Sequence, residues 1–137
     1  MTAAATRKLI ERYYQAFNAQ NVEGMLDCIG PGFVHDVSQG SRRKRKRLFA
    51  EFLAHMNRSY RETLSNIDIM TNRDGSRAAA EFDLKGKYLV TDPGLPEANG
   101  QTYKLRVGAF FDIRNDKIVR VSTHYNLSDW KAQVLGE

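Results

Sequence analysis

The stretch Ile67-Asp68-Ile69-Met70-Thr71-Asn72-Arg73-Asp74-Gly75-Ser76 decides the fold class of this chain. Its first four residues alternate between isoleucine and other side chains, which is the two-residue period of a strand. The Asp-Gly pair that follows is typical of a tight hairpin turn. Upstream of residue 60 the apolar residues recur instead at the three- and four-residue spacing of helices. The sequence therefore predicts helices first and antiparallel strands afterwards.

Three helices are predicted before the hairpin. The first covers about residues 3–19, and the second runs from an Asn21 cap through Cys28. A short strand at residues 33–37 precedes the third helix, which ends near residue 57 and has the six consecutive cations of residues 42–47 in its first turns. Each long helix has one apolar stripe: Leu9, Ile10, Tyr13, Ala16 and Phe17 in the first, and Leu48, Phe49, Phe52, Leu53 and Met56 in the third.

Three more strands are expected after the hairpin turn, at residues 78–90, 102–113 and 118–125, and Ser128 is expected to cap a last helix at 129–135. Helices followed by long antiparallel strands are the α+β pattern. We expect a single domain over residues 1–137. It should be a cone-shaped α+β barrel in which three to four helices pack on a strongly curved, mainly antiparallel sheet and enclose a pocket for one small hydrophobic ligand.

Composition excludes several classes of protein. With 42% hydrophobic and 27% charged residues the chain is an ordinary globular protein. Its apolar runs are too short for a membrane span and its first residues lack a signal core, so a cytoplasmic location is expected. The single Cys28 and three dispersed histidines offer neither an intramolecular disulfide nor a metal-binding spacing, and no cofactor is expected.

The net charge of +5 comes from residues 42–47, and the rest of the chain is close to neutral. This basic block could attract phosphate. However, no aromatic residues interleave with it and no recognition motif accompanies it, so nucleic-acid binding is the least favoured function. A solvated start of a helix is the preferred interpretation.

Asp36 is the first candidate for chemistry. It lies in the apolar run Phe33-Val34-His35-Asp36-Val37, where a carboxylate must be paired, protonated or ready to move a proton. Tyr13 on the first helix could meet it in one cavity. The alternative is a carboxylate at a strand end that caps the following loop or pairs with Arg42. His35 should point to the face opposite Asp36.

Several short motifs carry a resemblance to a known family. They are Arg12-Tyr13-Tyr14-Gln15-Ala16-Phe17-Asn18-Ala19, Val34-His35-Asp36, Glu51-Phe52-Leu53, and Phe110-Phe111-Asp112-Ile113 followed by Lys117-Ile118-Val119. In this order and spacing the chain resembles, over nearly its whole length, the ketosteroid-isomerase-like and SnoaL-like branch of the nuclear transport factor 2-like superfamily. The resemblance implies the cone-shaped fold and a cofactor-independent isomerase or lyase related to steroid delta-isomerase.

The resemblance also implies roles for individual residues. Asp36 matches the general base, and Tyr13 matches the tyrosine that donates a hydrogen bond to the enolate oxygen. Gly108 stands where that family has a second, protonated aspartate, which is a departure from the pattern. If Gly108 faces inward, Arg106 and Phe110 do too, and Arg106 would bind Asp36 or a substrate oxygen. An arginine that reaches solvent at the sheet rim is equally open.

The remaining expectations concern the two faces of the sheet. The substrate-binding residues are expected to be Phe17, Phe52, Tyr88, Arg106, Phe110 and Tyr125. His124 should face outward, whereas Val121, Thr123 and Tyr125 face inward. Val107, Ala109 and Phe111 would then leave an apolar outer face, through which a homodimer is expected to form.

The leading hypothesis for function is general-base proton transfer on a small apolar carbonyl compound, in an isomerase, cyclase or hydrolase reaction. Asp36 would be the base and Tyr13 the oxyanion donor. The alternative is a noncatalytic ligand-binding or dimerisation module, because one fold serves many functions.

Overall fold

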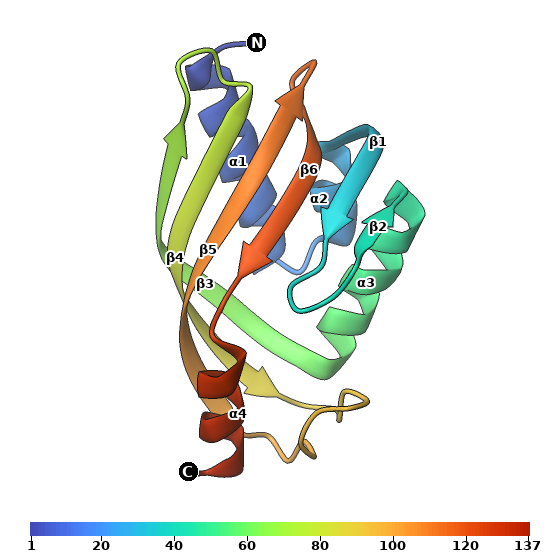
Figure 1. The fold of residues 1–137 in the computed structure, drawn as a ribbon, viewed down its shortest axis with the longest axis vertical. Coiled ribbons are helices and arrows are strands. Elements are labelled where there is room, and N and C mark those ends of the chain that lie inside the picture. The colour runs from blue at the N-terminus through green and yellow to red at the C-terminus, as the bar shows by residue number, and fades with distance from the viewer.

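Four helices and six strands make up the structure, a computed structural model that describes residues 1–137 (Figure 1). In chain order they are α1 (Ala3–Asn18), α2 (Val22–Asp27), β1 (Ile29–Asp36), β2 (Arg42–Lys44), α3 (Lys46–Ser59), β3 (Tyr60–Thr71), β4 (Arg77–Tyr88), β5 (Thr102–Arg114), β6 (Lys117–His124) and α4 (Leu127–Leu135). None of the helices has the length and apolar character that crossing a membrane requires.

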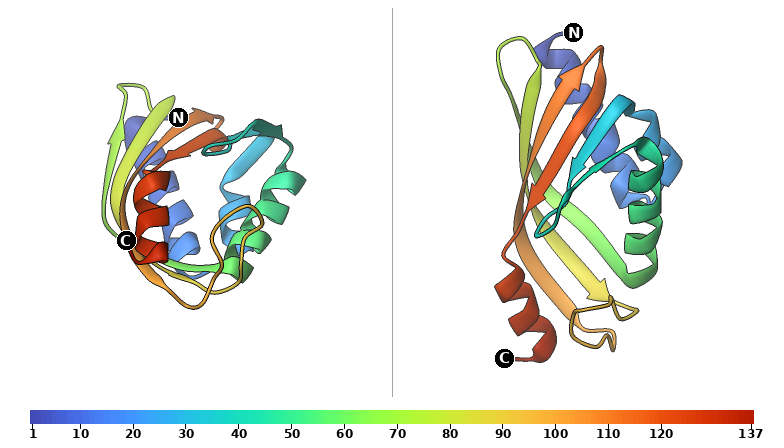
Figure 2. Two further views of the ribbon diagram at one scale, coloured as in Figure 1. Left: turned by 60° about the horizontal axis from the view of Figure 1, so that its bottom comes forward. Right: turned by 45° about the vertical axis from the view of Figure 1, so that its right-hand side comes forward.

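The strands form one curved sheet in the order β2-β1-β6-β5-β4-β3. All neighbours are antiparallel except β1 and β6, which run parallel. The sheet is strongly bent and does not close into a barrel, and α1 and α3 lie across its concave side (Figure 2). The expected α+β cone is therefore confirmed, with an open, mixed sheet in place of a closed barrel.

Local signals in the sequence explain the start of α1 and its attachment to the hairpin. The Thr2 side chain accepts a hydrogen bond from the backbone N–H of Ala5, as an N-cap does. One turn later the Thr6 hydroxyl donates to the carbonyl of Gly75 at 2.6 Å. Gly75 has a φ of 77°, and a Cβ there would meet the backbone of Thr2, so both the turn and the contact with the helix require glycine.

Only the last two residues of the basic block, Lys46 and Arg47, lie in a helix, whereas the whole block was expected there. Arg42–Lys44 form the short edge strand β2, which pairs with Val34–Asp36 of β1, and α3 begins only at Lys46. The Arg45 N–H donates to the carbonyl of Phe33, which ends the strand. Cations in the first turn of a helix would oppose its dipole, whereas an edge strand leaves them exposed to water at no such cost.

The facing expected for β5 is wrong. Tyr103, Leu105, Val107, Ala109, Phe111 and Ile113 are buried on the inner side, and the residues between them face outward. The neighbours Phe110 and Phe111 differ most clearly: Phe111 is 0% exposed and Phe110 is 46% exposed. This pair decides the facing of the whole strand, because side chains alternate between the two faces and every second residue shares the same side. The apolar outer face on which the expected homodimer depended does not exist in the form foreseen.

Candidate functional site

A cavity of about 350 Å³ lies between the concave side of the sheet and the helices. Twenty of its 28 lining residues are hydrophobic. The walls come from α1, α2, β1 and the loop after it, α3, the inner faces of β3 to β6, the start of α4 and the loop after β4. This volume and this lining suit one small, mostly apolar molecule.

The residues expected at the site fall into two groups. Tyr13, Phe17, Phe52 and Tyr125 line the cavity, as do Val121 and Thr123. Arg106, Phe110 and Asp36 lie outside it. Tyr88 is fully buried behind the wall, where its ring stacks on that of Tyr60 with 5.3 Å between centroids. His124 lies on the outer face, against Phe110, as expected.

Asp36 is on the outer side of the sheet and pairs with cations. Its carboxylate accepts hydrogen bonds from Arg42 at 2.7 and 3.1 Å and from Arg120 at 3.2 Å. The Arg42 hydrogen bond, followed by the weaker Arg120 contact, holds the pKa of Asp36 below its usual value. The expected meeting of Asp36 and Tyr13 in one cavity is therefore wrong, and the pairing with Arg42 that the sequence left open is what the structure shows.

Asp36 belongs to a charge ladder that crosses five strands. We use this name for Arg77, Asp112, Arg120, Asp36 and Arg42, which lie on β4, β5, β6, β1 and β2 and alternate in sign. The pairs inside it measure 3.1 Å for Arg77 and Asp112 and 2.8 Å for Arg120 and Asp112. A separate cluster on the same face joins Arg106 to Glu81 and Asp83 at 3.2 and 2.7 Å. Arg106 therefore has partners on the surface and does not reach the cavity.

The register of β1 turns His35 inward in place of Asp36. Phe33, 1% exposed, packs against Phe49 of α3 and fixes the inner side of the strand. His35 follows it two residues later and lines the cavity, with its ring 5.0 Å from that of Phe49 and 4.6 Å from that of Phe52. The opposite facing of His35 and Asp36 was expected, but the two sides are exchanged.

His35 is a buried imidazole without a partner. Neither ring nitrogen has a hydrogen bond within the protein, and Nδ1 is fully enclosed, which leaves Nε2 for a ligand. Burial first, and then the nearby Arg43, lower the pKa of His35 to about 4, against a smaller opposing effect of Asp36. The ring is therefore neutral at pH 7. An unsatisfied polar atom in an apolar core is costly, which marks it as a functional candidate.

The phenols of Tyr13 and Tyr14 on α1 can donate hydrogen bonds to a ligand in the cavity. Both rings line the cavity, stand edge to face with centroids 5.3 Å apart, and have hydroxyls with no partner in the protein. Burial raises the pKa of each, so both hydroxyls stay protonated and can donate a hydrogen bond. Tyr14 also lines a second hollow, between α1 and the edge strand β3.

Two carboxylates in the cavity wall were missed by the sequence reasoning. Glu62 on β3 accepts a hydrogen bond from the Tyr103 hydroxyl at 2.6 Å. Asp92, in the loop after β4, accepts one from Tyr60 at 2.7 Å and lies 3.0 Å from Nε2 of His55. A usable signal for Glu62 existed, because it falls at the inward position midway between two buried apolar residues of one strand.

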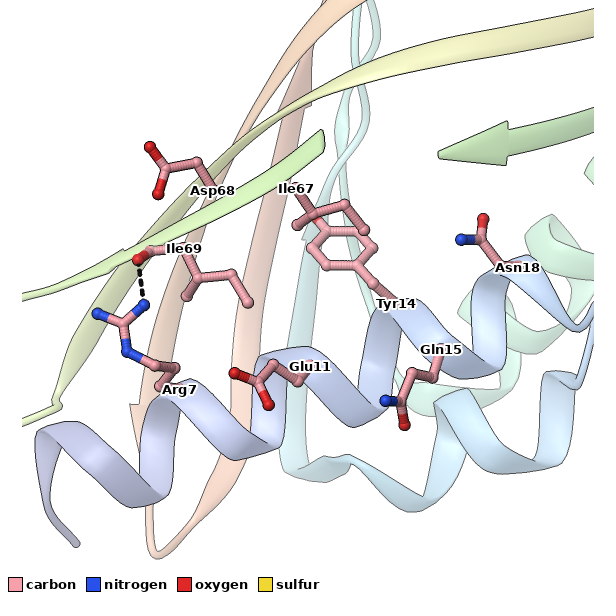
Figure 3. Close-up of a pocket in the computed structure, with 8 residues that line it drawn as sticks. All are labelled: Arg7, Glu11, Tyr14, Gln15, Asn18, Ile67, Asp68 and Ile69. Carbon is pink, nitrogen blue, oxygen red and sulfur yellow. Dashed lines mark hydrogen bonds between the residues drawn. The ribbon is translucent and has the colours of Figure 1, made fainter. Parts of the chain in front are cut away.

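A second, shallower hollow lies between α1 and β3 (Figure 3). Arg7 donates to the carbonyl of Ile69 at 2.5 Å, and the Asn18 amide bonds both backbone groups of Leu64 at 2.8 and 3.0 Å. Because β3 is at the edge of the sheet, these side chains satisfy backbone groups that no strand covers. The polar groups of Arg7 and Asn18 are thus already engaged with the edge strand.

A bent sheet around one apolar cavity is the architecture of the nuclear transport factor 2-like fold. A structure of a protein of that description from Anabaena variabilis has a TM-score of 0.73 to this chain at 22% identity, covering 91% of this chain and 89% of that one. More narrowly, the chain belongs to the SnoaL-like domain family, which matches residues 10–121.

Two solved structures are much more similar. A Pseudomonas putida protein is 52% identical with a TM-score of 0.93, and one from a Silicibacter species is 47% identical with a TM-score of 0.94. In both comparisons 98% of each chain is covered. Both proteins carry the provisional name polyketide cyclase. No curated protein matches the chain.

Proposed function

We propose that the protein is a cyclase-type enzyme that moves a proton on a small, mostly apolar carbonyl compound held in the cavity. The observation that carries this proposal is His35, an imidazole without a hydrogen-bond partner on the wall of an apolar cavity. The provisional name of the two similar proteins, polyketide cyclase, agrees with a substrate that has acidic C–H bonds beside carbonyl groups.

His35 replaces Asp36 as the base in this proposal. Neutral Nε2 accepts the proton from a carbon next to the carbonyl, and the electron pair moves onto the carbonyl oxygen. The hydroxyl of Tyr13 donates a hydrogen bond to that oxygen, with Tyr14 beside it. The low pKa of free His35 keeps it deprotonated, and the negative enolate then favours the imidazolium that forms.

The rival is a noncatalytic binding module with the same cavity. It predicts a bound ligand that leaves unchanged, whereas the enzyme must exchange the ligand's acidic protons with water. A bicyclic ketone such as β-tetralone is a suitable probe, because it is compact and apolar and has protons on both sides of its carbonyl.

Proton NMR in deuterium oxide tests the proposal by following loss of the α-proton signals of β-tetralone above the uncatalysed rate. We expect the wild type to catalyse exchange and His35→Gln to lose about 100-fold or more of it. His124→Gln is the matched control, since this histidine lies on the outer face. Exchange by His35→Gln at the wild-type rate would refute the role of His35. Asp36→Asn in the same assay tests the base that the sequence suggested.

A homodimer through the outer sheet face stays part of the proposal on a different ground. Phe110 and Met70 are exposed apolar side chains on the outer side of β5 and β3, beside charged residues of both signs. Sedimentation of the wild type and of Phe110→Lys measures the oligomeric state, and a dimer that the substitution dissociates supports this interface.

The expected cytoplasmic location likewise stays a proposal, to be measured by fractionation.

A further inference from the structure

Glu62 is a carboxylate in the cavity wall that no cation neutralises. No lysine, arginine or histidine forms an ion pair with it. Tyr103 donates to it, and Tyr60 precedes it by two residues on β3. The other titratable groups of the same cavity include Tyr125, Asp92 and the imidazole of His35. Burial without a cation disfavours the ionised form of this carboxyl group.

Three strands cooperate to hold Glu62 in place. Glu62 on β3 is opposite Gly86 on β4, and Gly86 is opposite Tyr103 on β5. The Tyr103 ring lies over Gly86, where a Cβ would overlap it. Only because the middle strand has no side chain at this position can the phenol reach across and bond Oε2 of Glu62 at 2.6 Å.

This arrangement leaves the other half of the carboxyl group for a ligand. Oε1 has no partner within the protein, and Glu62 retains partial exposure, which the cavity supplies. Burial raises the pKa of Glu62, and the Tyr103 hydrogen bond opposes that rise in part. A raised pKa favours the protonated form of the carboxyl group, which is the form that a general acid needs.

We propose that Glu62 is a second catalytic group, a general acid that Tyr103 orients across Gly86 and that protonates an oxygen of the bound substrate. The inference rests on the proposed function and concerns the role of Glu62 when a cyclase substrate has two carbonyl groups. His35 takes the α-proton at the first carbonyl, and the enolate carbon forms a C–C bond to the second carbonyl carbon.

The balance of this step is simple. The C–H electron pair becomes the new C–C bond through the enolate, the π pair of the second carbonyl moves to its oxygen, and that oxygen takes the proton of Glu62. The resulting carboxylate keeps the Tyr103 hydrogen bond, which is stronger to an anion. Proton transfer from His35 back to Glu62 through water restores both groups.

The experiment separates this role from that of His35. The probe is 2,6-heptanedione, an acyclic diketone that closes to a six-membered ring by an internal aldol step. The cyclic product is measured by chromatography. We expect Glu62→Gln to retain exchange of α-protons and to lose about 100-fold of the cyclisation rate. Glu81→Gln is the matched control, because Glu81 is on the outer face with Arg106. Cyclisation by Glu62→Gln at the wild-type rate, or exchange without cyclisation by the wild type, overturns the proposal.

A measurement without substrate keeps the test independent of activity. Infrared difference spectra of wild type and Glu62→Gln at neutral pH should show one protonated carboxyl band that the variant lacks and that shifts in deuterium oxide. Tyr103→Phe should raise the pKa of Glu62, so the cyclisation rate of this variant should fall at higher pH than that of the wild type. Absence of the band overturns the proposal, whether or not the protein exchanges the α-protons of β-tetralone.

Discussion

Replacement of Asp36 by asparagine separates a structural role from a catalytic one. The change keeps the size of the side chain but removes the charge that joins Arg42 and Arg120. The contact with Arg42 is at the surface and adds little. Arg120, with 19% of its side chain exposed, is better shielded but keeps Asp112 at 2.8 Å. We therefore expect a loss of about 1 kcal/mol in the free energy of unfolding, or about 3–4 °C in Tm.

Thermal unfolding and α-proton exchange should be measured on the same samples. The Tm difference should shrink in about 1 M salt, where the Debye screening length is about 3 Å and the attraction between exposed charges is weakened. Because folding lowers the pKa of Asp36, its contribution is complete above the pKa of the unfolded chain and is lost as pH falls through the folded value. Asp112→Asn, in the same ladder, is the control and should also lower Tm. A loss of 100-fold in exchange by Asp36→Asn at unchanged Tm would refute the assignment of Asp36 to the ladder.

Three further changes test His35 in the cavity wall and the packing of β4 behind it. Since the pKa of His35 is lowered to about 4 from 6.5, its stabilising effect is complete above 6.5 and declines as pH falls towards 4; denaturant unfolding from pH 8 to 4 should show a flatter profile in His35→Phe. Gly86→Ala should cost about 1–3 kcal/mol in unfolding, because its Cβ overlaps the Tyr103 ring, and a wild-type stability would contradict this packing. Tyr88→Phe removes a hydroxyl that donates to Pro96 at 2.7 Å and accepts from the Asp92 N–H at 2.9 Å, so limited proteolysis should cut the loop after β4 faster.

Features that depend on neighbours in sequence were the ones that sequence reasoning predicted well. The first helix ends within a residue of its expected limit, and the Asp74-Gly75 turn is where the pattern put it. The strand β2 was missed because its formation depends on pairing with β1, while its own three residues are all cations. The carboxyl of Glu62 was missed for a similar reason, since its importance comes from Gly86 and Tyr103 on other strands.

The choice between His35 and Asp36 shows where the limit lies. Both residues are polar, they are adjacent, and a strand must turn one of them inward. Apolar residues on both sides of the pair made the run ambiguous by pattern alone. Two distant interactions decide it: Phe33 packs on Phe49 of α3, and Asp36 meets Arg120 of β6. A slip of one residue would expose Phe33, bury Asp36 without a cation and break the charge ladder, so the same contacts that stabilise the sheet place the imidazole in the cavity.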